Sequence, residues 1–215
     1  MSIYFFPGCK YSAHNPEGIQ KLSSYLSQQF GVVSAGCCSV DHAKPEPEDL
    51  VLYQCPTCGL ILSESGRCPS LQSIYEFLLT DSDFPWPDYQ GRSMTIQDCW
   101  RVRENSGYLD AIRQVIWRMN ICGVELERNR ERANFCGVTL YQEPSERYER
   151  LAYQSLVVHG AFHPCSREEQ LANMRAHGRQ YTTDEVICVC TGCMEGVRLG
   201  GHRPVHLLDL VLDMD

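Results

Sequence analysis

Cysteine is the residue type whose number and spacing most directly indicate chemistry in this sequence. The chain has 215 residues, of which 13 are cysteines. Two Cys-x-x-Cys motifs, at residues 55–58 and 190–193, each follow an apolar segment that predicts a β-strand. Two thiolates on the turn after a strand can point at one metal while backbone N–H groups face the sulfurs, which suits zinc or iron–sulfur chemistry. The motifs therefore predict two metal-binding sites.

Further cysteines precede each motif and divide the candidate ligands into two sets. Five thiolates exceed the four that a tetrahedral zinc ion or a cubane cluster needs, which favours an iron–sulfur cluster at the first set. Four thiolates at the second set fit either a cubane 4Fe–4S cluster or zinc, and structural zinc is the alternative at both. The first cysteine set is Cys9, Cys37, Cys38, Cys55 and Cys58, and the second cysteine set is Cys99, Cys136, Cys190 and Cys193.

The composition places these cysteines in a globular protein. Hydrophobic residues make up 43% and charged residues 21% of the chain, so a core can form without disulfides. The sequence has no run of eighteen apolar residues, so no transmembrane helix is expected. Its N-terminus lacks the features of a signal peptide. We therefore expect a cytoplasmic protein, in which dense cysteine indicates metal or redox chemistry rather than disulfides.

Charge and missing motifs narrow the function classes. The net charge of −8 argues against nucleic acid or an anionic membrane surface as a partner. The sequence contains no G-x-S-x-G, Gly-rich phosphate loop or H-E-x-x-H, and no G-x-G-x-x-G that marks an NAD or FAD site. In a redox protein, electrons then come from an electron-donor protein or from other subunits of a redox complex. A thiol or disulfide substrate is compatible with this composition.

The elements that must position the cysteines follow a regular order in the first half. An apolar strand is expected over residues 3–6, and a helix begins after the N-cap Asn15 and stops at Gly31. A strand over residues 50–53 leads into the first Cys-x-x-Cys motif, and an apolar segment over residues 74–79 closes the half.

The second half repeats this order. A strand over residues 94–96 ends before Cys99, a helix begins at about Gly107, and a strand over residues 186–189 leads into the second Cys-x-x-Cys motif. Helices are also expected around residues 144–156 and 166–177, in a stretch without a counterpart in the first half.

The repeated order predicts the fold class and its division. We expect an α/β fold with two pseudo-symmetric cysteine-rich halves, each a small, mainly parallel sheet flanked by helices. The first half spans residues 1–85, and the second spans residues 86–215 with an insertion at about 139–187. A repeat of this length indicates duplication of a domain rather than a solenoid.

Six short motifs in order resemble a known family. PGC, GCCS and CPTC stand in the first half, and DC, NFCG and CTGC stand in the second. Their order is similar to that of the duplicated cysteine-rich CCG domain found in heterodisulfide reductase and its relatives, over essentially the whole chain. The resemblance implies a non-cubane 4Fe–4S cluster at the first cysteine set and a second metal centre at the second set. It also implies cleavage of a disulfide between the two centres.

Two residues depart from the family pattern. Phe135 stands where the first cysteine of a pair is expected, so the second centre is implied to be a cubane 4Fe–4S cluster, an altered cluster or zinc. Ser39 replaces a glycine and leaves the five cysteines of the first set in place. The implied function is thiol/disulfide reduction or electron transfer within a larger complex, and whether the chain is itself a disulfide reductase (oxidoreductase) component stays open. The alternative is a non-catalytic zinc- or cluster-binding scaffold subunit of a redox complex.

Four cysteines have no place in the repeat: Cys68, Cys122, Cys165 and Cys188. Cys122 follows an isoleucine in an apolar context and is expected in the core. Cys188 alternates with Cys190 along a predicted strand, and a structural role is favoured over a role as ligand or redox partner.

Charged residues near the cysteines have two interpretations each. Arg101 and Arg103 follow Cys99 closely and either favour a thiolate or an anionic substrate, or have a solvated or structural role. His42 and His163 lie near cysteines of the two sets, and a surface or loop position is favoured over ligation.

Overall fold

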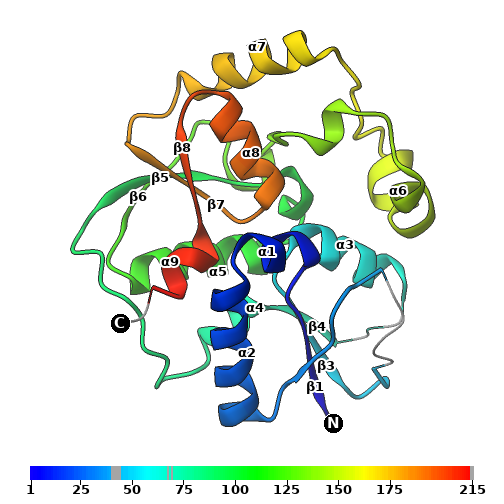
Figure 1. Cartoon of the computed structure of the whole chain (residues 1–215), viewed down its shortest axis with the longest axis vertical. Helices are drawn as coiled ribbons and strands as arrows, with labels where there is room; N and C mark the ends of the chain where they lie inside the picture. Colours follow the sequence, from blue (N-terminus) through cyan, green and yellow to red (C-terminus); the bar gives the residue numbers. More distant parts are fainter. Residues whose placement is uncertain (40–44, 67, 69, 214–215) are drawn as a thin grey trace.

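The chain forms two four-stranded sheets, each flanked by helices (Figure 1). This is a computed structural model that describes residues 1–39, 45–66, 68 and 70–213. All strand pairs in both sheets are parallel. The predicted α/β fold with two pseudo-symmetric halves is therefore confirmed. Over the described ranges, no helix has the length and hydropathy that crossing a bilayer requires.

The first sheet has the strand order β2-β1-β3-β4. Its first strand is central, so the second strand pairs on one side of it and the third on the other. In chain order the first half contains β1 (Ile3–Phe6), α1 (Cys9–His14), α2 (Pro16–Phe30), β2 (Val33–Ser34), β3 (Leu50–Tyr53), α3 (Pro56–Glu64), β4 (Ser70–Ser73) and α4 (Ile74–Leu78).

The second sheet has the equivalent order, β6-β5-β7-β8. Its sheet strands and the helices between them match the first half, and the added segment lies between β6 and β7. In chain order this half contains β5 (Ser93–Gln97), the 3-10 helix η1 (Trp100–Val102), α5 (Ser106–Arg118), β6 (Cys122–Val124), the 3-10 helices η2 (Arg130–Arg132) and η3 (Thr139–Tyr141), α6 (Glu146–Leu151), the π-helix η4 (Tyr153–Val158), α7 (Arg167–Gly178), β7 (Glu185–Cys188), α8 (Thr191–Leu199), β8 (Arg203–His206) and α9 (Leu207–Val211).

Local sequence signals explain why α2 begins and ends where it does. The Asn15 side chain accepts a hydrogen bond from the Gly18 backbone N–H at 2.8 Å, and Pro16 occupies the first helical position. Gly31 ends the helix at φ 67°, a left-handed conformation that glycine adopts without the steric cost of a side chain. The predicted limits of this helix are confirmed.

The apolar segment over residues 74–79 forms the short helix α4, and α9 holds the corresponding position in the second half. Each of these helices is preceded by an edge strand, β4 or β8, that was not predicted from the sequence. Ser73 caps α4 through a capping box, in which its hydroxyl accepts from the Glu76 N–H and the Glu76 carboxylate accepts from the Ser73 N–H. The edge strands β4 and β8 are short and largely polar, so they lack the alternating pattern that marks a half-buried strand.

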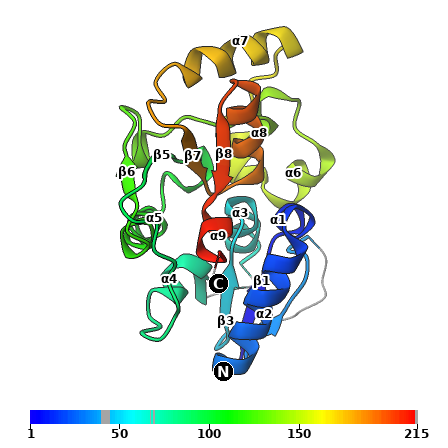
Figure 2. The same ribbon diagram turned by 60° about the vertical axis from the view of Figure 1, so that its left-hand side comes forward.

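Contacts between the halves come from helices and strand ends rather than from a shared sheet. The C-terminal helix α9 lies against the first half (Figure 2), where the Asp209 carboxylate accepts hydrogen bonds from Tyr11 Oη at 2.7 Å and from Asn15 Nδ2 at 2.8 Å. Tyr108 of α5 donates from Oη to the backbone oxygen of Gln54 at 3.2 Å. These contacts join the two sheets around one continuous core.

Candidate metal centres

Parallel topology brings the candidate cysteines to one edge of each sheet. Cys9 follows β1 and Cys55 follows β3 in the first half, whereas Cys99 follows β5 and Cys190 follows β7 in the second. The carboxyl ends of parallel neighbouring strands meet at the same edge, which is where open α/β sheets place their ligand sites. The predicted position of these four cysteines at strand ends is confirmed.

Each Cys-x-x-Cys motif begins a helix at this edge. Cys55 is the N-cap of α3 and Cys190 is the N-cap of α8. A hydrogen bond from the Cys58 thiol, followed by backbone N–H groups, lowers the pKa of Cys55. In the same way, hydrogen bonds from the thiols of Cys193 and Cys99 lower the pKa of Cys190. Both N-caps are therefore the positions at which a thiolate is favoured.

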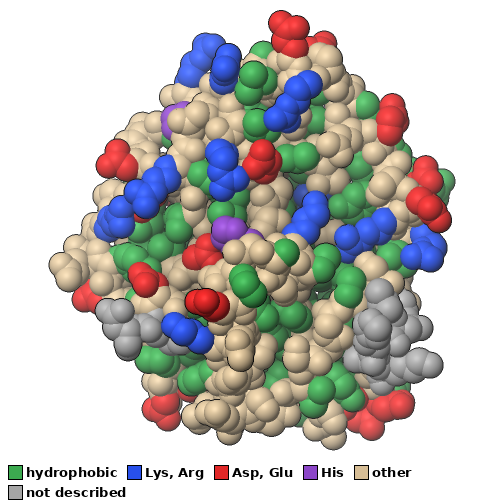
Figure 3. Space-filling view, viewed as in Figure 1, with side chains coloured by type: hydrophobic (Ala, Val, Ile, Leu, Met, Phe, Trp, Pro, Cys, Tyr) green, Lys and Arg blue, Asp and Glu red, His purple; other side chains and the backbone are tan. Residues whose placement is uncertain are grey.

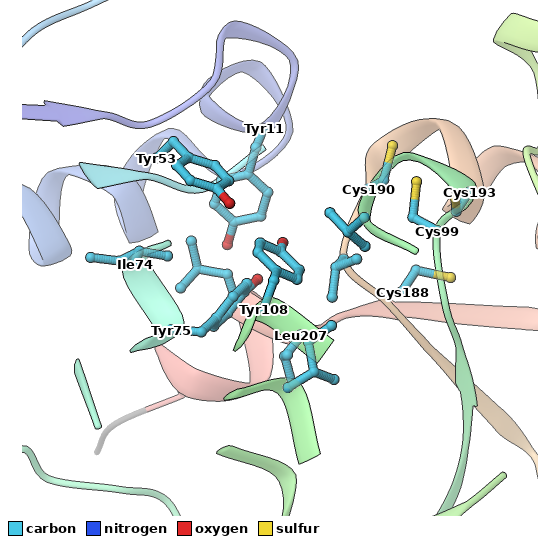
Figure 4. Packing of buried hydrophobic residues seen from close by; sticks show 14 of the residues in the cluster. Tyr11, Tyr53, Ile74, Tyr75, Cys99, Tyr108, Cys188, Cys190, Cys193 and Leu207 are labelled. Atoms are coloured by element: carbon cyan, nitrogen blue, oxygen red, sulfur yellow. The ribbon is translucent and has the colours of Figure 1, made fainter. Parts of the chain in front are cut away.

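The second cysteine set contains the tightest group of sulfurs in the described part of the chain. The Sγ atoms of Cys99, Cys190 and Cys193 all lie within 4.8 Å of one another and all three residues are buried (Figure 4). Cys136 is also buried, and its Sγ lies 3.5 Å from Nη1 of Arg101, which donates to it. The structure thus brings three predicted ligands together and places the fourth beside an arginine.

Arg101 is a buried cation next to these thiols. The residue is only 5% exposed, and its Nε and Nη2 atoms have no hydrogen-bond partner among the described residues. Burial disfavours the charged form, but attraction to the thiolates of Cys136, Cys99 and Cys190 outweighs it and raises the pKa of Arg101. Of the two interpretations left open by the sequence, the contact with thiols is the one that the structure shows.

The first cysteine set is looser. The buried Cys58 thiol can donate its one proton to either Cys38 or Cys55, and the hydrogen bond from Cys58 lowers the pKa of Cys38 to about 6. Cys9 is exposed and Cys37 is half-buried. Among residues that the structure describes, no three sulfurs of this set all lie within 4.8 Å of one another.

An arginine from the insertion reaches the first cysteine set. Nη2 of Arg147, in α6, donates to Sγ of Cys38 at 3.7 Å although the two residues are 109 positions apart in the sequence. This residue was not predicted from the sequence, because α6 lies in a segment without a counterpart in the first half. No local motif marks it, and only the packing of one half on the other reveals the contact.

The two cysteine sets open onto one cavity between the halves. Its volume is about 30 Å³, which holds about two water molecules or a group of that size. Cys9, Cys55 and Cys58 of the first set line it together with Cys190 of the second set. The N-termini of α3 and α8 therefore face the same space from opposite halves.

The lining of this cavity is cationic although the chain carries a net charge of −8. Lys10, Arg101 and Arg147 contribute to it, and no Asp or Glu is among the described residues that line it. On the face shown in Figure 3, Lys and Arg side chains lie mainly over the upper half of the molecule.

The cysteines outside the two sets have separate positions. The prediction that Cys122 lies in the core is wrong: it is exposed, because it begins β6 at the edge of the second sheet, where only one neighbouring strand pairs with it. Cys188 is buried and donates to the backbone oxygen of Val186 at 3.8 Å, and its sulfur points away from the group of three (Figure 4). His163 is exposed as expected, whereas His42 lies outside the described residues.

Comparisons with known proteins give little guidance. No protein-family model matches the chain, and no curated protein matches it. A solved structure that aligns with it is the aspartate racemase of Picrophilus torridus, at 11% sequence identity and a TM-score of 0.33. The alignment covers 99% of this chain and 91% of that chain. A likeness of this degree says nothing about the activity of this chain, so function has to be argued from the site.

Proposed function

We propose that this chain is a cytoplasmic iron–sulfur redox protein that resembles the CCG-domain component of heterodisulfide reductase and acts in thiol/disulfide reduction or electron transfer within a larger complex. The observation that carries the proposal is the common cavity of the two cysteine sets. Two purely structural metal sites have no need to face each other. Two redox centres that act on one substrate, or that exchange electrons, must lie close together.

The residues present fit metal centres of this kind. The five cysteines of the first set and the four of the second supply soft thiolate ligands, the type that iron–sulfur clusters and zinc prefer. A bound cluster supplies a one-electron redox couple whose potential depends on ligation, nearby charge and burial. The chain itself holds the thiolates at two helix N-termini, keeps cations beside them and limits the volume open to water between the halves.

Zinc in a non-catalytic scaffold is the second candidate, favoured by the sulfur spacing of the second set. Zn–S bonds of about 2.3 Å place tetrahedral sulfurs about 3.8 Å apart. The mutual distances of Cys99, Cys190 and Cys193, all within 4.8 Å, are close to this value. In a cubane cluster each thiolate binds a different iron, so the sulfurs must be spread further apart.

Metal content and colour separate the two candidates. After anaerobic purification and reconstitution with iron and sulfide, the redox proposal predicts a brown protein with about four irons per occupied set. Reduction should then produce paramagnetic signals, and Cys38→Ala should abolish those of the first set. Cys122→Ser is the matched control, because Cys122 is exposed and lies at the sheet edge away from both sets. A colourless protein with stoichiometric zinc after the same treatment contradicts the redox proposal.

Turnover tests the enzymatic form of the proposal. With reduced viologen as electron donor and 2-hydroxyethyl disulfide as substrate, the reconstituted protein should produce thiol. Cys38→Ala should remove this activity and Cys122→Ser should retain it. Full activity of Cys38→Ala would show that the first cysteine set is not the reactive centre.

A further inference from the structure

We propose that Arg101 and Arg147 are counter-cations of the two cysteine sets, one guanidinium for each set, and that the insertion of the second half serves to bring Arg147 to the first set. The inference rests on the proposed function in one respect, namely that the cysteine sets bind metal. Both arginines line the cavity between the halves, and each donates to a cysteine of a different set.

Among the described residues, Arg101 has no partner that can neutralise it other than the thiolates. No Asp or Glu in the described part of the chain forms an ion pair with it, and its contact is with Cys136. A buried, unpaired charge is strongly disfavoured, so a compensating negative charge must lie beside it. The candidates are Cys136, Cys99 and Cys190, whose thiolates carry negative charge when they bind metal.

The first half has no arginine at the equivalent position. Arg101 stands two residues after Cys99, and the residue two positions after Cys9 is Tyr11. Tyr11 is 2% exposed and its hydroxyl is used in the contact with Asp209. Lys10 lines the cavity beside Cys9, but a guanidinium for the first set must come from elsewhere in the fold.

Arg147 fills this role from the other half. Its Nη2 donates to Cys38, and its Nε is buried without a hydrogen-bond partner among the residues that the structure describes. Within the described ranges, no carboxylate pairs with Arg147 either. The largest attraction that its guanidinium experiences comes from Cys38, followed by Tyr148 and then by Cys9 and Cys58 of the first cysteine set.

Hydrogen bonds to the first half hold the insertion in the position that the contact between Arg147 and Cys38 requires. The Glu64 carboxylate, at the C-terminal end of α3, accepts hydrogen bonds from the backbone N–H groups of Gln154 at 2.9 Å and Ser155 at 3.0 Å, and from Ser155 Oγ at 2.7 Å. The N-terminal end of the same helix carries Cys55. Helix α3 thus holds one of the metal ligands at one end and the segment that follows Arg147 at the other.

A cation beside a metal–thiolate centre has two measurable effects. It favours the deprotonated thiolates, so metal binds more tightly, and it offsets negative charge, so an iron centre is easier to reduce. Loss of a group that contacts metal ligands in this way typically lowers metal affinity about 10- to 100-fold. Each arginine should act on its own set.

Cobalt(II) titration tests this assignment without requiring iron. In a Cys190→Ser background, which leaves the first set intact, Arg147→Gln should weaken Co²⁺ binding at least about tenfold and Arg101→Gln should have a much smaller effect. In a Cys55→Ser/Cys58→Ser background, which removes the Cys-x-x-Cys pair of the first set and leaves the second set intact, the order should reverse. Arg150→Gln is the matched control for Arg147, because Arg150 is exposed on the same helix. Arg103→Gln is the matched control for Arg101, because the Arg103 guanidinium carbon lies over the Trp100 ring, 4.6 Å from its centroid. Neither control should change the affinity.

A charge-conserving variant separates the electrostatic role from packing. Arg101→Lys should recover most of the affinity lost in Arg101→Gln, with far-UV circular dichroism confirming that both variants fold. In iron-loaded protein, Arg101→Gln should also shift the reduction potential of the second set to a more negative value. The inference is overturned if both glutamine variants bind Co²⁺ like the wild type, if Arg101→Lys is as weak as Arg101→Gln, or if the wild type binds no Co²⁺ at all.

The outcomes also distinguish the inference from the proposed function. If iron does not assemble but the arginine variants weaken Co²⁺ binding, the redox proposal fails and the counter-cation role stands. If iron assembles and the arginine variants change neither affinity nor potential, only the counter-cation role fails.

Discussion

Cys55 and Cys190 hold equivalent positions in the two halves and line the same cavity. Each follows the third strand of its sheet and is the N-cap of the helix that comes next, α3 for Cys55 and α8 for Cys190. The two residues are close enough that a thiolate at Cys190 opposes one at Cys55 by like-charge repulsion. The pseudo-symmetry of the two halves therefore places Cys55 and Cys190 against one cavity rather than in two independent sites.

Because Cys55 and Cys190 belong to different cysteine sets, we expect substitution of either one to remove metal from its own set only. Cys55→Ser should reduce the metal content of the first set and leave that of the second unchanged, whereas Cys190→Ser should do the opposite, because each removes a ligand from its own set. Metal analysis with absorption spectra measures both contents. Cys122→Ser, at the exposed edge of the second sheet, should bind metal like the wild type. Loss of both centres in one single variant would contradict two separate sets.

Residue 137, beside the second cysteine set, has no room for a side chain larger than that of glycine. A Cβ at this position would lie 2.2 Å from the backbone oxygen of Gly192 and 2.5 Å from the backbone nitrogen of Gly196. Since α8 would have to move, we expect Gly137→Ala to lower the free energy of unfolding by about 3 kcal/mol in urea denaturation. Gly192→Ala is the control, because its Cβ would meet nothing nearer than the Cys190 sulfur at 3.6 Å. Equal midpoints for the two variants would show that Gly137 is not tightly packed.

His206 predicts a pH dependence of stability. It is fully buried, and burial lowers its pKa from 6.5 to about 4, so the folded protein binds its proton less readily than the unfolded chain. The contribution of His206 is therefore complete above pH 6.5 and is lost as the pH falls toward 4, by up to about 3 kcal/mol.

Urea unfolding at pH 7, 5 and 4 measures this contribution as a difference between variants. His206 Nδ1 accepts from the Leu208 N–H, and asparagine can retain this cap, so His206→Asn should fold but lose less stability between pH 7 and pH 4 than the wild type. Parallel pH profiles for the two proteins would contradict a buried neutral histidine.

Glu64 predicts a link between the insertion and the first cysteine set. Glu64→Ala removes the acceptor for three hydrogen bonds from Gln154 and Ser155, so amide hydrogen exchange over residues 144–160 should become faster. Global stability should fall by about 1 kcal/mol or more. Ser63→Ala changes an exposed neighbour on the same helix and should leave the exchange unchanged.

The same variant should affect metal binding at a distance. Because Arg147 precedes the anchored segment, Glu64→Ala should weaken Co²⁺ binding at the first cysteine set and leave the second set as it is. Faster exchange without any change in affinity would mean that Arg147 keeps its position independently of this anchor.

Much of the fold could be predicted because the deciding interactions are local. The strands over residues 3–6 and 50–53 were predicted with their observed limits, and α2 is fixed by Asn15 and Gly31 at its ends. The short helix α1 was missed, since its six residues carry no side-chain cap and no amphipathic repeat. The edge strands β4 and β8 were missed for the related reason that polar residues on a sheet edge give no alternating pattern.

The sequence by itself determined which cysteines stand at strand ends, because strand limits and Cys-x-x-Cys spacing are properties of short segments. Only the tertiary structure decided that the two sets share a cavity, that Arg101 is buried against Cys136 and that Arg147 reaches Cys38. The shared cavity and the Arg147–Cys38 contact depend on how one half packs on the other, and the Arg101–Cys136 contact depends on how segments 35 residues apart fold together within the second half, so no local pattern encodes them. Cys122 shows that a local pattern can also mislead. Its apolar neighbours predicted burial, but its place at the edge of the sheet left it exposed.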